Sequence, residues 1–87
     1  MDYHIRECIK IAIALESKGV NVDYLKQAIS AIFYNRNPEP YDTQRLFYTI
    51  ALLGDSYPEC KEQITALQVS AVEIHVGILA GRRSTAF

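Results

Sequence analysis

The longest stretch of helical periodicity lies near the C-terminal end of the chain, between Ser56 and Gly81. Ser56 and Glu59 have the S-x-x-E spacing of a capping box at a helix start. Gly81 is a residue that can take the left-handed conformation that closes a helix. These signals predict a helix over residues 57–80 and a mobile tail over 82–87. The apolar residues of the core stripe recur at spacings of three and four, and they are Cys60, Ile64, Leu67, Ala71, Ile74 and Ile78.

The second half of this segment carries more apolar surface than one small core requires. At about 100° per residue, Val69, Val72 and Val76 form a second apolar face beside the core stripe. A helix that is apolar over such a wide arc is enclosed by neighbours or meets a partner. Gly77 costs roughly 1 kcal/mol of helix stability relative to Ala, which favours a close contact near this residue. We therefore predict that this face binds another protein or a second copy of the chain.

Three shorter amphipathic segments precede the long helix. Their apolar spacing predicts helices over residues 3–18, 23–35 and 43–53, with Asp42 or Thr43 capping the last of these. The residues expected to end these helices are Gly19, the prolines at positions 38 and 40, and Gly54. The predicted fold is all-α, a single domain over residues 1–87 in which two helical hairpins form a compact four-helix arrangement. The apolar side chains expected to face the core of this domain include Ile9, Ile13 and Phe33.

Two other interpretations of the pattern remain open. Residues 9–15 and 72–78 alternate between apolar and other side chains, so an α+β fold with these segments as paired strands is the alternative. The two hairpins also align at an offset of 35 residues, with Gly19 on Gly54. This offset resembles the period of the tetratricopeptide repeat, about 34 residues. The small and aromatic signature positions of that family are mostly not met, so we assign no membership.

Tyr34, Tyr48 and Leu52 lie outside the predicted core faces of the second and third helices. They are predicted to form an exposed aromatic and apolar patch that assists the valine face in binding. The alternative is that each is covered by another element or stands alone on the surface, as single tyrosines and leucines commonly do.

Composition narrows the class of protein. The chain has 87 residues, of which 49% are hydrophobic and 22% charged, as in an ordinary soluble domain. No run of about twenty apolar residues is present, and the N-terminus lacks the features of a secretion signal, so we expect a cytoplasmic protein that does not span a membrane. The net charge of −1 gives no electrostatic footprint for nucleic acid. The arginines that a DNA-binding protein would use are scattered over three segments, at Arg36, Arg45, Arg82 and Arg83.

Residues with catalytic or metal-binding chemistry are few. Two histidines and two cysteines, His4, His75, Cys8 and Cys60, lack the paired spacing of a zinc site. Both cysteines lie on apolar helix faces and are expected to be buried free thiols. The sequence contains no phosphate-binding loop, nucleophile elbow or H-E-x-x-H pair. We predict no enzymatic activity, no cofactor, no metal and no small-molecule substrate.

The sequence as a whole predicts a non-enzymatic protein–protein interaction module, such as a small adaptor, a chaperone or an inhibitor. Its predicted binding residues are Val69, Val72, Val76 and Gly77, with Tyr34, Tyr48 and Leu52 assisting. The alternative is a small transcriptional regulator that binds DNA as a dimer.

Overall fold

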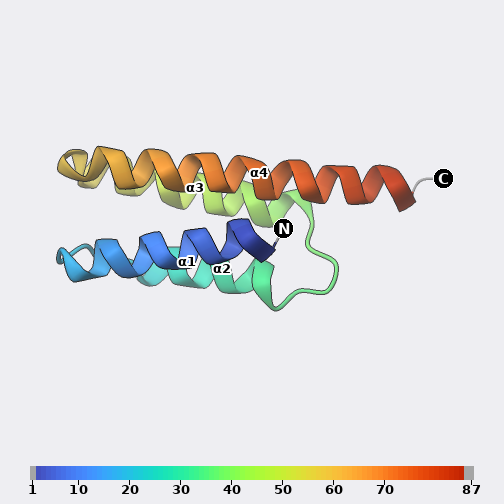
Figure 1. Cartoon of the computed structure of the whole chain (residues 1–87), viewed down its shortest axis with the longest axis horizontal. Helices are drawn as coiled ribbons and strands as arrows, with labels where there is room; N and C mark the ends of the chain where they lie inside the picture. Colours follow the sequence, from blue (N-terminus) through green and yellow to red (C-terminus); the bar gives the residue numbers. More distant parts are fainter. Residues whose placement is uncertain (1, 86–87) are drawn as a thin grey trace.

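The structure, a computed structural model, describes residues 2–85 and the side chains of residues 3–81. The elements in chain order are α1 (Asp2–Ser17), α2 (Asp23–Phe33), α3 (Pro40–Ser56), a 3-10 turn η1 (Pro58–Cys60) and α4 (Lys61–Thr85). The prediction of an all-α, four-helix fold is confirmed (Figure 1). The α+β alternative is wrong, because residues 9–15 lie within α1 and residues 72–78 within α4.

The helices form two antiparallel hairpins, α1–α2 and α3–α4, that lie side by side (Figure 1). Each helix contacts the next one along the chain, and α4 also contacts α1, so the four helices surround a shared core. The described part of the molecule is elongated, with extents of 45 × 19 × 19 Å. Helix α4 is the longest element, and its C-terminal end projects beyond the other three helices.

The core draws apolar side chains from every helix. Deeply buried residues include Leu15 of α1, Leu25 of α2, Leu46 of α3 and Leu67 of α4, each with no measurable exposure. The connection between α1 and α2 also contributes, because Val20 and Val22 are buried in the same core. The buried apolar residues of α4, which fix the side it presents to the core, are Ile64, Leu67, Ala71, Ile74 and Ile78.

Gly19 ends α1 as predicted. Its φ of +86° lies in the left-handed region that a side chain disfavours. The backbone amides of Gly19 and Val20 donate to the carbonyl oxygens of Glu16 and Leu15 at 3.0 and 3.1 Å, which satisfies the end of the helix.

Helix α2 ends before the two prolines as predicted, at Phe33 rather than at residue 35, but the predicted end of α3 and the predicted start of α4 are wrong. Gly54 lies inside α3, which continues through Ser56. Tyr57 follows the last residue of the helix and packs against the core. Its backbone N–H donates to the carbonyl oxygen of Leu53 at 2.8 Å. Ser56 therefore belongs to the end of α3 rather than to a capping box, and a 3-10 turn precedes α4. A glycine at a helical position weakens a helix, but only packing or hydrogen bonding makes the chain turn away.

The end of α4 also differs from the prediction. Gly81 has helical rather than left-handed backbone geometry, and the helix continues to Thr85. Residues 82–85 are therefore helical and not a mobile tail, whereas residues 86–87 lie outside the described residues.

The third helix starts earlier than predicted. It begins at Pro40, whose missing N–H costs nothing in the first turn, rather than at Asp42 or Thr43. The carboxylate of Asp42 accepts a hydrogen bond from the backbone N–H of Glu39 at 2.8 Å, so a capping box stands at the start of α3.

Candidate functional site

The outer side of α4 carries the most regular exposed apolar surface of the described residues. Val69, Val72 and Val76 are 60, 49 and 54% exposed. At about 100° per residue they lie on the side of α4 opposite the buried Leu67 and Ala71. We call these three residues the valine face. Its side chains are available to a partner along two turns of a regular helix.

The valine face is uncovered because of the arrangement of the four helices. Helix α4 contacts α1 and α3 through the side that carries its buried residues. Each helix in the bundle packs against its neighbours around one core, so no described element lies over the outer side of α4. The excess apolar surface read from the sequence is therefore left exposed by the chain itself.

A polar contact between α3 and α4 helps to set the rotation of α4. Thr43 is fully buried, and its hydroxyl donates to the carbonyl oxygen of Pro40 at 2.9 Å. Thr43 Oγ1 also lies within hydrogen-bond distance of His75 Nδ1, so the hydroxyl joins the start of α3 to α4. The His75 ring also meets the Phe47 ring edge-on, with centroids 5.5 Å apart. Since Val76 follows His75 at about 100° around the helix, this contact turns Val76 towards the outside.

We predicted a close contact at Gly77 because a glycine weakens a helix, but no group of the described chain packs closely on it. A Cβ placed on Gly77 would meet no atom within 4 Å. The residue is exposed near the valine face, so any group that packs closely on it must come from outside the described chain.

The predicted aromatic and apolar residues are all exposed, but two of them line different hollows. Tyr34, 81% exposed, lines a groove between α1 and α2. Leu52, 49% exposed, lines a hollow between α2 and α3 together with Tyr24. Tyr48, 68% exposed, lines neither of these hollows. The structure therefore does not gather the three into one of these hollows.

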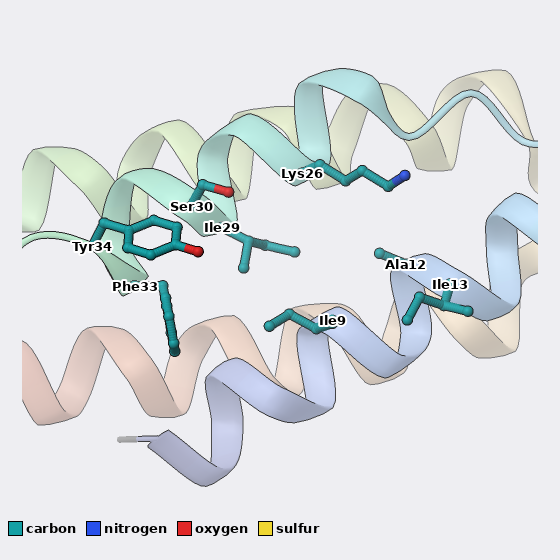
Figure 2. Close-up of a pocket in the computed structure, with 8 residues that line it drawn as sticks. All are labelled: Ile9, Ala12, Ile13, Lys26, Ile29, Ser30, Phe33 and Tyr34. Carbon is teal, nitrogen blue, oxygen red and sulfur yellow. The ribbon is translucent and has the colours of Figure 1, made fainter.

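The groove between α1 and α2 is a second apolar surface, which the sequence did not reveal. It has a volume of about 370 Å³, and Ile9, Ile13 and Phe33 line it from the two helices (Figure 2). The prediction that these three residues face the core is wrong: they are 37, 58 and 48% exposed. The apolar arc of α1 is wider than the stripe that its buried residues occupy, but the width of the arc alone does not indicate which of its residues stay exposed.

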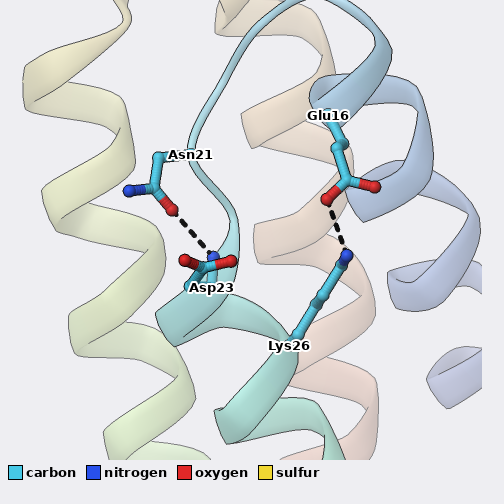
Figure 3. Close-up of polar contacts among 4 residues, drawn as sticks. All are labelled: Glu16, Asn21, Asp23 and Lys26. Carbon is cyan, nitrogen blue, oxygen red and sulfur yellow. Dashed lines mark hydrogen bonds and ion pairs between the residues drawn. The ribbon is translucent and has the colours of Figure 1, made fainter.

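An ion pair joins α1 and α2 beside this groove. Lys26 Nζ lies 2.6 Å from a carboxylate oxygen of Glu16, and both side chains are about half exposed (Figure 3). In the adjoining loop the Asn21 side chain accepts a hydrogen bond from the Asp23 backbone N–H at 3.1 Å. Because both side chains are exposed, the ion pair contributes only on the order of 0.5 kcal/mol to the stability of the fold.

The long C-terminal segment is also compatible with a membrane by length and composition. Residues Pro58–Gly81 form a stretch long and apolar enough to cross a bilayer, although no run of about twenty purely apolar residues is present. Core helices of soluble proteins can have the same length and composition. In this structure 33% of the most apolar part of the segment is buried. In this fold the apolar length of α4 is divided between the core and the valine face.

Other site types lack a geometric basis in the described part of the chain. Among those residues, no group of three or more His, Cys, Asp or Glu side chains lies close enough to hold a metal ion. Cys8 and Cys60 are buried free thiols, as predicted. Arg36 lies in the connection after α2 and Arg45 on α3, so these arginines do not share one recognition helix.

Comparisons with protein-family models, with curated proteins and with solved structures gave no match to this chain.

Proposed function

We propose that this protein is a non-enzymatic interaction module that binds another protein chain through the valine face of α4. The observation that carries the proposal is that Val69, Val72 and Val76 stay about half exposed on one side of a helix whose other side is packed into the core. An apolar stripe on a regular, packed helix is a surface that association can bury.

The physical basis is burial of apolar area by an ordered surface. Burying apolar surface contributes roughly 25 cal/mol per Å², so three half-exposed valines supply a gain that a partner helix or groove can recover. β-branched valines on a helix also lose little side-chain freedom on binding, because their χ1 angle is already restricted. The face is therefore ready to bind without rearrangement of α4.

This mode of binding suits an adaptor, a chaperone or an inhibitor, because each acts by covering a surface of another protein. The partner chemistry implied is an apolar helix or shallow apolar groove without a charge at its centre. A charged partner surface would lose its hydration against the valines without gaining an opposite charge.

The proposal is tested by introducing a charge at the centre of the face. Val72→Glu should leave the helical circular dichroism unchanged and abolish binding, because Val72 is exposed in the folded chain. The matched control is Ile13→Glu, which makes a similar change at an exposed aliphatic residue of the α1–α2 groove. The wild type, Val72→Glu and Ile13→Glu proteins are each immobilised and exposed to extract of the source cells, and self-association is measured in parallel.

The proposal is supported if a partner bound by the wild type and by Ile13→Glu is lost with Val72→Glu, in extract and again with purified components. Binding that survives Val72→Glu but not Ile13→Glu would move the site to the groove. Equal binding by all three proteins would remove both surfaces from consideration.

A further inference from the structure

We draw no further inference here: the strongest candidate, the apolar groove between α1 and α2, has Lys26 as its one charged lining residue, already paired with Glu16, and nothing in the described part of the chain shows what covers it.

Discussion

Gly77 lies on the exposed surface of α4 with open space where a side chain would stand. A glycine inside a helix costs stability relative to alanine because its unfolded backbone has more freedom. We therefore expect Gly77→Ala to raise the free energy of unfolding by roughly 0.5–1 kcal/mol, measured by urea denaturation at a concentration where the protein is monomeric.

Gly19→Ala is the matched comparison. Gly19 has a φ of +86°, so the same substitution should lower the free energy of unfolding by about 1 kcal/mol, even though no atom lies within 4 Å of the added Cβ. A decrease in stability for Gly77→Ala at low concentration would contradict the open surroundings of this residue.

Cys8 gives the chain a pH-dependent stability in the alkaline range. Burial, with a smaller effect from the carboxylate of Glu7, raises the pKa of the Cys8 thiol from 9.0 to about 11. Below pH 9 the thiol is protonated in both the folded and the unfolded chain, so it contributes no pH dependence. Above pH 9 the unfolded chain loses this proton while the folded chain keeps it, so stability falls as the pH rises.

At pH 10 the expected loss from this thiol is roughly 1 kcal/mol, and it levels off above pH 11. The measurement is urea unfolding between pH 8 and pH 10.5 for the wild type and for Cys8→Ala, in which Cys60 remains. The difference in unfolding free energy between the two proteins should shrink over this range. A constant difference would show that Cys8 is not shielded from solvent in the folded chain.

At the scale of elements, the capping box of α3 has a matched control at the other end of the same helix. Asp42→Ala removes the carboxylate that accepts the Glu39 backbone N–H, and it should lower the free energy of unfolding by about 1 kcal/mol. Asp55→Ala removes a carboxylate from the last turn, where the helix dipole disfavours negative charge, and should be neutral or slightly stabilising. Thermal unfolding of both variants checks the contrast, and equal effects would argue against a cap at Asp42.

The contact between Thr43 and His75 joins α3 to α4. Thr43→Val removes the hydroxyl that bridges Pro40 and His75, and we expect a loss of about 1–2 kcal/mol, because the partly buried His75 ring loses a hydrogen-bond partner. Thr49→Val is the control, since the Thr49 hydroxyl donates only to the Arg45 carbonyl within α3 in the contacts seen. In chemical denaturation the two variants should differ by at least about 0.5 kcal/mol. Equal losses would remove the interhelical role of Thr43.

The helices could be predicted from the sequence because their apolar periodicity is strong, but several of their ends could not. Gly19 ends α1 because the backbone turns there and the amides of Gly19 and Val20 find carbonyl partners. Gly54 and Gly81 look the same in the sequence, yet both remain helical. The difference depends on tertiary packing, such as that of Tyr57 on the core, which local sequence does not encode.

The exposure of the valine face could be predicted, whereas the α1–α2 groove could not. On α4 the buried stripe and the valines occupy opposite sides, so the excess apolar arc is plain. On α1, Ile9 and Ile13 lie next to the buried Ile5 and Ala12, and only the distance between the two helices decides whether they are covered. That distance is set by the packing of whole helices rather than by the pattern within one.

At the scale of the whole molecule, a four-helix fold of 87 residues leaves the outer side of each helix without a covering layer. Helix α4 is the longest helix and is apolar on two sides, and α1 and α2 add the exposed Ile9, Ile13 and Phe33 of the groove between them. A dimer through α4 would join two elongated bundles along their length and bury the valines of both. Folding and association would then be thermodynamically linked.

This linkage makes the thermal midpoint depend on protein concentration. If the folded chains pair and the unfolded chains do not, a 100-fold increase in concentration above the dissociation constant should raise the midpoint by roughly 5 °C or more. Val72→Glu should unfold at a midpoint that is independent of concentration, whereas Ile13→Glu should retain the dependence, because its substitution lies in the groove of the other hairpin. Differential scanning calorimetry over this range measures all three proteins. A wild-type midpoint that does not move would show that the fold gains nothing from a second copy, which would argue against self-association through the valine face.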